Sequence, residues 1–330
     1  MRSPTRRERT AGTAAGAAAG LIWGLAFLIP VLLPGWSPVA VTAGRYLAYG
    51  AVSVVLFALD GRALWRLLRQ HWGVALAFAL TGNILYYLLL VIGIELVGAP
   101  VASIVIGCLP VTVALLGNAL SRAYRWRSLV LPATLVAAGL VIVNVLALGG
   151  ASPAADRSLG PAVLGLLAVV GAVLLWTWYG LANARFLSRH PEVPGGGWST
   201  VIGLGTGAIT LAALPVAALS GQLAPEPSGR PPSLAAFLVA VLVLGVVVSW
   251  AATSLWNVAA ARLPPTVAGM LINIETVAGF GYVYAARGEW PPLGQVAGFA
   301  LILAGVLLVV RLRATKAVPA ESRLSRAMLL

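Results

Sequence analysis

Charge is what this chain has least of, since only 9% of its 330 residues are Asp, Glu, Lys or Arg and 60% are hydrophobic. A soluble domain carries about 25% charged residues, so too few remain here to cover a water-facing surface. Cysteine and histidine are scarce as well, with one and two copies. Cys108 lies alone in an apolar run, which excludes a disulfide framework. His71 and His190 form no metal constellation, so we expect no metal and no cofactor.

Long apolar runs dominate instead. Ten of them occupy residues 14–33, 39–59, 72–96, 99–120, 130–148, 161–181, 201–219, 234–258, 265–285 and 293–310. Each run is long enough to cross a hydrocarbon core of about 30 Å as a helix. The sequence therefore predicts an all-α polytopic membrane protein of ten transmembrane helices. No connecting loop is large enough to hold a catalytic domain, so we do not expect an enzyme. Pro110 and Pro215 should interrupt helical hydrogen bonding in the fourth and seventh runs.

The arginines and lysines are sorted between alternate loops. Of the 22, 18 lie at the N-terminus, in every second loop or at the C-terminus, three (Arg157, Arg230 and Arg287) lie in the other loops, and Arg45 lies inside the second run. Basic loops stay on the cytoplasmic side of a bilayer. We therefore expect a multi-pass protein of the plasma or inner membrane with both termini in the cytoplasm. Although the net charge is +13, the dispersed basic residues indicate contact with lipid rather than with nucleic acid.

An internal repeat relates the two halves of the chain at a shift of 166 residues. Ala102 falls on Ala268 and Gly139 falls on Gly305. Because each half has five runs, the second half should be inverted, which is the architecture of alternating-access transporters. The predicted divisions are a cytoplasmic N-terminus (1–13), a first five-helix repeat (14–148), an outer linker (149–160), a second repeat (161–311) and a cytoplasmic tail (312–330).

Four stretches give the chain a family resemblance. They are GLIWGLAF (20–27), GRYLAYGAVSVVL (44–56), CLPVTVALLGNAL (108–120) and NIETVAGFGYVYAARGEWPPLGQVAGFALILAGVLL (273–308). Together they resemble the EamA family of the drug/metabolite transporter superfamily. The chain departs from the family pattern at Glu275-Thr276, where Glu-Pro is frequent, and at Ser121-Arg122, where the first repeat lacks the Gly-Glu loop. The resemblance implies a ten-helix transporter that exports amino acids or other small metabolites.

Two charged residues lie inside predicted spans. Glu275 is about ten residues from either end of the ninth run, and a lone carboxylate there should face a cavity or a partner. It is a candidate for binding a substrate amine or for proton coupling, and the alternative is a structural hydrogen bond to a neighbouring helix. Arg45 is a candidate gating or charge-pair residue. It could instead reach the outer interface, pair with Glu275 or Glu95, or hold a substrate carboxylate.

Polar and aromatic side chains recur at helical spacing on five of the spans. We expect spans one, three, six, eight and nine to line a central cavity, although packing or an interfacial aromatic belt would give the same spacing. The predicted substrate-binding set is Glu275, Trp23, Asn83, Tyr86, Tyr87, Trp176, Tyr179, Asn183, Trp250, Asn257 and Tyr282.

The interpretation that follows is a secondary transporter that exports small amphipathic metabolites, with amino acids as the leading class. Its partners would be a small-molecule substrate, the lipid bilayer and, as a candidate, protons. No nucleotide-binding P-loop is present. Gly12, Gly16, Gly20 and Gly24 recur every fourth residue, which indicates close helix packing or, as the alternative, a homodimer. The alternatives in function are a drug, nucleotide-sugar or lipid-linked substrate, or a non-transporting membrane sensor or assembly partner.

Overall fold

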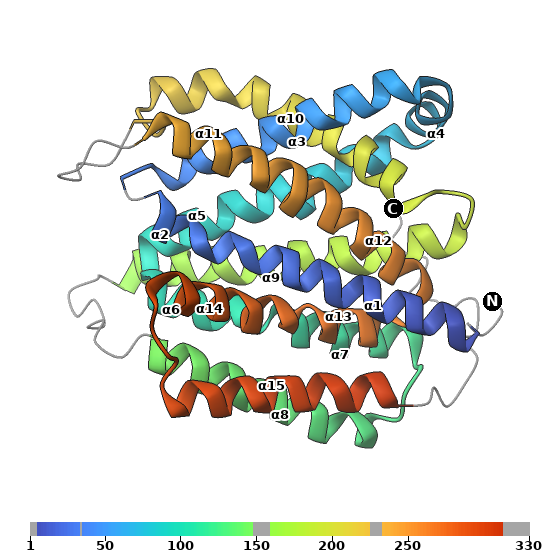
Figure 1. The fold of residues 1–330 in the computed structure, drawn as a ribbon, viewed down its shortest axis with the longest axis vertical. Helices are drawn as coiled ribbons and strands as arrows, with labels where there is room; N and C mark the ends of the chain where they lie inside the picture. The colour runs from blue at the N-terminus through green and yellow to red at the C-terminus, as the bar shows by residue number, and fades with distance from the viewer. Residues whose placement is uncertain (1–4, 34, 148–158, 225–232, 313–330) are drawn as a thin grey trace.

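The computed structural model describes residues 5–33, 35–147, 159–224 and 233–312. Within them, ten helices are long and apolar enough to cross a membrane, and they pack side by side as one bundle (Figure 1). This confirms the predicted all-α polytopic fold. Spans one to five consist of α1 (Arg6–Trp23), η1 (Gly24–Leu28) and α2 (Ile29–Leu32); α3 (Pro38–Leu59); α4 (Gly61–Ala79), η2 (Leu80–Ile84) and α5 (Leu85–Val97); α6 (Ala99–Gly107) and α7 (Leu109–Ser121); and α8 (Trp126–Ala147).

The second half has the same number of spans. Spans six to ten consist of α9 (Leu159–Arg189); α10 (Gly195–Leu219); α11 (Leu234–Leu242), η3 (Val243–Ala251) and α12 (Ala252–Arg262); α13 (Pro265–Leu271) and α14 (Asn273–Arg287); and α15 (Leu293–Arg311). The segment η1 is a 3₁₀ helix, whereas η2 and η3 are π-helices.

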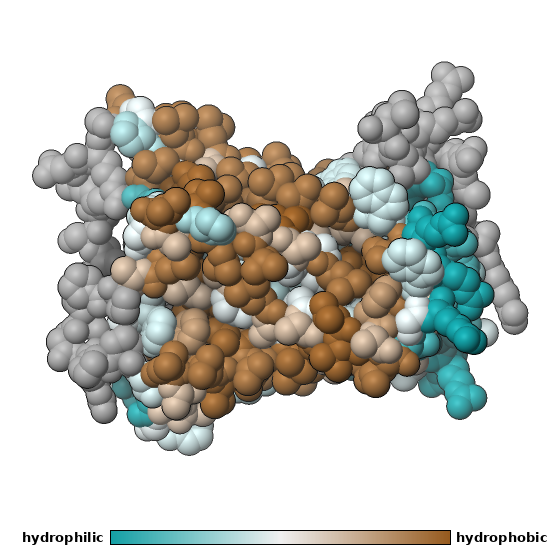
Figure 2. Space-filling view, turned by 90° about the horizontal axis from the view of Figure 1, so that it is seen from above, coloured by the Kyte–Doolittle hydropathy of each residue, from teal (hydrophilic) through white to brown (hydrophobic). Residues whose placement is uncertain are grey.

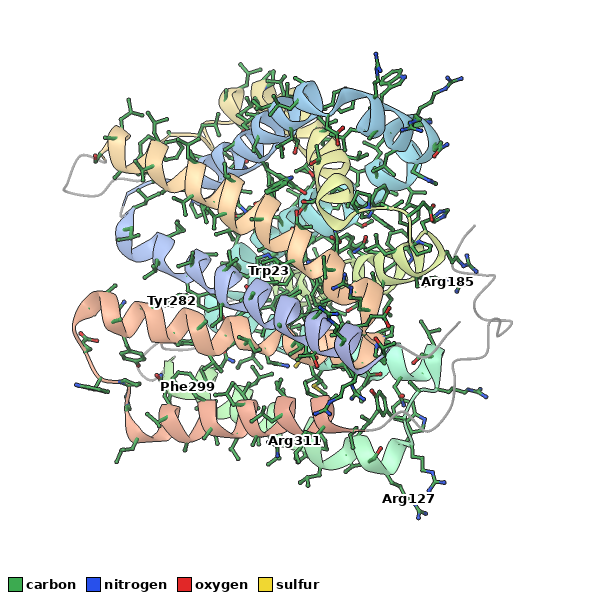
Figure 3. The ribbon with its side chains drawn as sticks, turned by 45° about the vertical axis from the view of Figure 1, so that its right-hand side comes forward. Trp23, Arg127, Arg185, Tyr282, Phe299 and Arg311 are labelled. Atoms are coloured by element: carbon green, nitrogen blue, oxygen red, sulfur yellow. The ribbon has the colours of Figure 1, made fainter. Side chains whose placement is uncertain are left out.

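The outer surface of the bundle is apolar around its middle. Figure 2 shows a hydrophobic band, with hydrophilic residues gathered most densely at the end where α4 begins. Leu164 of span six and Val239 of span eight are more than 60% exposed, as expected where the solvent is lipid rather than water. The start of α1 and the end of α15 lie at that same end, as do Arg127 and Arg185, whereas Tyr282 lies toward the opposite end (Figure 3). We call these the arginine-rich end and the far end.

The spans pack in pairs that suit the predicted repeat. Span two packs against span seven, span four against nine, and span five against ten, while span three packs against six and span one against eight. Exchanging each span with the one five places along the chain leaves this set of pairs unchanged. Gly50 and Gly207 bring spans two and seven so close that a Cβ atom on Gly50 would lie 2.7 Å from the Cα of Gly207. Small residues permit such contacts in membranes.

The first span begins earlier than the sequence analysis expects. Its helix starts at Arg6 rather than near residue 14 because Thr5 and Glu8 form a capping box, in which each side chain bonds the other's backbone N–H. Most of the predicted N-terminal segment 1–13 is therefore helical. The predicted linker 149–160 and tail 312–330 lie almost wholly outside the described residues.

The two interior prolines behave differently. Span four is interrupted at Cys108, two residues before Pro110, as expected. Span seven, however, continues through Pro215 as one helix, although Pro215 has no N–H to donate to the carbonyl one turn earlier. The fixed φ of proline suits a helix, and membrane helices tolerate the missing N–H group when neighbouring groups compensate.

The glycine stripe on span one consists of Gly12, Gly16, Gly20 and Gly24, and it packs against other spans of the same chain. A Cβ atom on Gly16 would lie 2.8 Å from the Leu271 side chain, and one on Gly24 would lie 2.8 Å from the backbone nitrogen of Gly279. All four stripe glycines are buried. The homodimer alternative through this face is therefore wrong, because spans eight and nine of the same chain already cover it.

Candidate functional site

Glu275 lies at an interruption in the ninth span. The helix breaks at Ile272, between α13 and α14, and Glu275 occupies the first turn of α14. The N-terminus of a helix carries a partial positive charge, which favours a carboxylate at that place. Span four breaks at Cys108. The 166-residue shift places Cys108 directly before Glu275 in the sequence. Paired interruptions at corresponding positions of two repeats mark the binding site in many transporters.

Arg45 points into the bundle from span two. Its Nε donates a 2.7 Å hydrogen bond to the Oγ of Ser249 on η3, and its guanidinium carbon lies 5.6 Å from the centre of the Tyr46 ring. It therefore does not reach out to the interface. Within the described part of the chain it forms no ion pair with Glu275 or Glu95, so the pairing that was one alternative for Arg45 is not formed in this structure.

The charges of Glu275 and Arg45 nevertheless lie within electrostatic range of each other, and Tyr86 of span three lies within electrostatic range of both. All three side chains keep partial exposure although they lie in the middle of the bundle. No ion pair or hydrogen bond among the described residues occupies the carboxylate of Glu275. Two opposite charges, one on span two and one on span nine, are thus left without an ion-pair partner and are available to a third group.

Three tryptophans form a cluster between spans one, six and eight. The ring of Trp23 lies 6.4 Å from that of Trp176 and 5.6 Å from that of Trp256, and Trp176 also contacts Tyr179 at 5.7 Å. The predicted neighbours Trp23, Trp176 and Tyr179 are therefore brought together. The Nε1 of Trp256 is buried and has no hydrogen-bond partner among the described residues, which leaves a donor beside the cluster.

On span three, Asn83 and Tyr87 form hydrogen bonds to spans two and seven. The Nδ2 of Asn83 donates to the Oγ1 of Thr206 at 3.0 Å, and its backbone carbonyl accepts a 3.3 Å bond from the hydroxyl of Tyr46. The hydroxyl of Tyr87 donates to the carbonyl of Pro38 at 3.1 Å. Asn83 therefore joins spans two, three and seven, and Tyr87 ties span three to the start of span two.

Asn183 and Asn257 bond each other. The Nδ2 of Asn183 donates to the Oδ1 of Asn257 at 2.9 Å, the Oδ1 of Asn183 accepts from Trp198, and the Nδ2 of Asn257 donates to the carbonyl of Gly195. Both side chains are fully buried. In this conformation they hold spans six, seven and eight together at the arginine-rich end and present no polar atom to a ligand.

Trp250 and Tyr282 are placed apart from these groups. The Nε1 of Trp250 donates to the Oγ1 of Thr200 at 3.0 Å, and the ring lines a separate cavity toward the arginine-rich end. The hydroxyl of Tyr282 donates to the carbonyl of Leu21 at 3.2 Å, which links span nine to span one. The predicted residues therefore divide into two kinds. Several groups mainly join helices, and the others belong to a central group that contains Glu275, Arg45, Tyr86, Trp23, Trp176 and Tyr179.

Two residues of the central group were absent from the predicted set. Ser249 anchors Arg45, and Trp256 completes the tryptophan cluster. A serine within an apolar run has no distinguishing pattern, so only its contact with Arg45 reveals it. Its place on a π-helix is equally hidden in the sequence, although π segments are frequent at functional sites.

Comparisons with known proteins give the chain its family. A model described as the EamA-like transporter family matches residues 10–145 and 163–311. The inner membrane protein YtfF of Escherichia coli (strain K12) is 33% identical over 293 residues, covering 87% of this chain and 91% of that protein. One solved protein structure has the same fold, with a TM-score of 0.71 at 23% identity, over 91% of this chain and 96% of that one. The resemblance inferred from the sequence is confirmed, and the chain belongs to the EamA-like transporter family.

Proposed function

We propose that this protein is a secondary transporter that exports small amphipathic metabolites, with amino acids as the leading class, by alternating access through a central cavity. The observation that carries the proposal is the pair Glu275 and Arg45. They are opposite charges on spans two and nine near the middle of the bundle, within electrostatic range but not bonded to each other. A charge inside a membrane span without an ion-pair partner is unfavourable, and a zwitterion between the two would satisfy both.

A substrate of this kind would be held at two ends. Its ammonium group would bind Glu275, and its carboxylate would bind the terminal guanidinium nitrogens of Arg45, which Ser249 holds only through Nε. Arginine binds carboxylates through two parallel hydrogen bonds. The Trp23 and Trp176 rings offer an apolar surface to the side chain of the substrate. A nucleotide-sugar would need several cations, and Arg45 is the one that the described central group supplies.

Alternating access is supported by the arrangement of the two halves. The span pairs are unchanged when the halves are exchanged, and spans four and nine are interrupted at corresponding places. We place the arginine-rich end in the cytoplasm because basic loops are retained there. The Asn183–Asn257 pair joins spans six and eight of the second half at that end, whereas the tryptophan cluster joins span one of the first half to spans six and eight. The contacts of the tryptophan cluster would therefore rearrange when the cavity opens inward.

The proposal is tested by transport itself. Purified protein in liposomes is exposed to a library of labelled amino acids and other small metabolites, with and without an imposed proton gradient. We expect saturable flux of one or more zwitterions, and a dependence on the gradient would assign proton coupling. A protein that carries no member of the library in either condition would instead favour a sensor or assembly role.

A further inference from the structure

The strongest feature outside the central group is a cavity between spans two and three at the arginine-rich end. It has a volume of about 610 Å³, within the range of ligand sites, and its walls come from the end of α3, the first half of α4 and the start of α10. It exists because α4 packs much more extensively against α10 than against α3, although α3 and α4 are consecutive. We call this space the α3–α4 wedge.

The first part of α4 places the wedge at the membrane surface. Residues 61–70 carry three arginines and precede a kink at His71, where φ is −131° and ψ is 18°. Trp65 lies within this segment and Trp72 follows it, and they are 56% and 62% exposed. Outward tryptophans and arginines next to an apolar band are typical of a helix lying at the interface between lipid and water. The mouth of the wedge therefore meets the headgroups of one leaflet.

The lining of the wedge changes from charged to apolar with depth. Arg66 and Gln70 belong to the α4 segment at the mouth and Asp60 immediately precedes it. Leu56 of α3 and Leu64 of α4 continue the wall, and Trp250 belongs to the middle of span eight. A membrane lipid has the same order of groups along its length, from headgroup to acyl chain.

The charges at the mouth also fit one class of headgroup. Asp60 precedes α4, but its side chain makes no capping hydrogen bond. Arg66 bonds only the carbonyl of Arg62, at 3.4 Å, and has no ion-pair partner among the described residues. Glu192, by contrast, is occupied by His190 at 3.0 Å, and its own backbone hydrogen bond and that ring lower its pKa below the ordinary value.

We propose that the α3–α4 wedge is a binding site for one phospholipid whose headgroup carries both a phosphate and a primary ammonium group, namely a phosphatidylethanolamine. Arg66 binds the phosphate, Asp60 binds the ammonium, and an acyl chain extends along Leu56 and Leu64 toward Trp250. This site is separate from the Glu275–Arg45 pair and does not depend on the proposed transport.

Lipid binding is measured directly to test the site. The delipidated protein is titrated with short-chain phosphatidylethanolamine or phosphatidylglycerol, which lacks the ammonium group, and bound lipid is counted by native mass spectrometry. The wild type should bind phosphatidylethanolamine more tightly. Arg66→Gln should weaken its binding about tenfold, equivalent to about 1.4 kcal/mol, and Asp60→Asn should reduce it to the level of phosphatidylglycerol.

Two further variants make the result specific. Arg69→Gln removes a neighbouring charge that does not line the wedge and should leave binding unchanged, whereas Ala63→Phe should fill the wedge and weaken both lipids. Equal effects of Arg66→Gln and Arg69→Gln would overturn the site, as would equal affinity for the two lipids. Binding of free phosphoethanolamine as tight as that of the lipid would show that the chain is not part of the ligand.

Discussion

At the scale of residues, Glu275 and Arg45 are the costly choices of this sequence. A charged side chain at the centre of a membrane helix costs about 2.5–3.5 kcal/mol on insertion scales. The structure offsets part of this for Glu275 through the start of α14, and part for Arg45 through Ser249 and the Tyr46 ring. Neither side chain neutralises the other directly. Charges kept at such a cost without a partner are expected to bind something that enters.

Glu275→Gln is predicted to lower substrate flux by tenfold or more while the protein still inserts and remains monodisperse. The amide keeps the size of the side chain but cannot bind an ammonium group as an anion. Flux is measured in liposomes across a pH series. Glu289→Gln, which neutralises an exposed acid after span nine, is the matched control and should transport normally. Equal flux of Glu275→Gln and the wild type at every pH would remove the proposed role.

Asn183→Ala is predicted to destabilise the protein by about 1–3 kcal/mol, because it leaves the Nε1 of Trp198 and the Oδ1 of Asn257 buried without their hydrogen-bond partner. The thermal midpoint in detergent should fall accordingly. Asn144→Ala is the control, since Asn144 bonds only the Leu140 carbonyl of its own helix, and it should shift the midpoint little. Comparable shifts in the two variants would contradict the structural role of the Asn183–Asn257 pair.

At the scale of elements, five spans depart from regular α-helical geometry. Spans one, three and eight contain η1, η2 and η3, while spans four and nine are broken at Cys108 and Ile272. Two of the central polar contacts involve these segments, because η3 presents Ser249 to Arg45 and η2 presents the Asn83 carbonyl to Tyr46. Departures of this kind free backbone groups and redirect side chains, and here they coincide with the candidate site.

Gly24→Ala is predicted to destabilise the junction between η1 and α14 by about 1–3 kcal/mol, since the new methyl group would lie 2.8 Å from the Gly279 nitrogen and 2.9 Å from the Ala278 Cβ. Gly281→Ala on the same α14 meets nothing within 4 Å, and should be neutral or slightly stabilising. Thermal unfolding of the two variants is compared in one detergent. A neutral Gly24→Ala would show that the contact between spans one and nine is loose.

At the scale of the whole molecule, the arginine-rich end and the apolar band define how the bundle lies in the membrane. Arg9 adds a link across this end, because its Nη2 donates to the carbonyls of Val310 and Leu312 at the end of span ten. These hydrogen bonds join the beginning of span one to the end of span ten. Our proposed orientation puts this joined end in the cytoplasm.

The orientation is predicted to be visible by chemical labelling. In a Cys108→Ser background, Ser152→Cys in the predicted outer linker should react with a membrane-impermeant maleimide added to intact cells. Arg125→Cys, at the exposed arginine-rich end, should react only after the membrane is permeabilised. The opposite pattern of protection would invert the proposed topology.

Much of this protein could be predicted because a bilayer imposes strong constraints on a sequence. Ten apolar runs could only be ten spans, since every backbone polar group must be bonded within lipid, and the sorted arginines predict their orientation. The central position of Glu275 followed from its distance to either end of its run. These properties depend on position along the chain alone, which is why one sequence is enough to predict them.

What the tertiary structure decided is which side chains meet. The same helical spacing marks Trp23 and Trp176 on the one hand and Asn183, Asn257 and Trp250 on the other. In the structure, however, Asn183 and Asn257 form a hydrogen bond with each other, and Trp250 lines a separate cavity. Periodicity defines the face of a helix but not the neighbour opposite that face. The separation of Arg45 from Glu275, the anchoring by Ser249 and the α3–α4 wedge all depend on how far neighbouring spans diverge. That divergence results from close packing across spans distant in sequence, which no local pattern records.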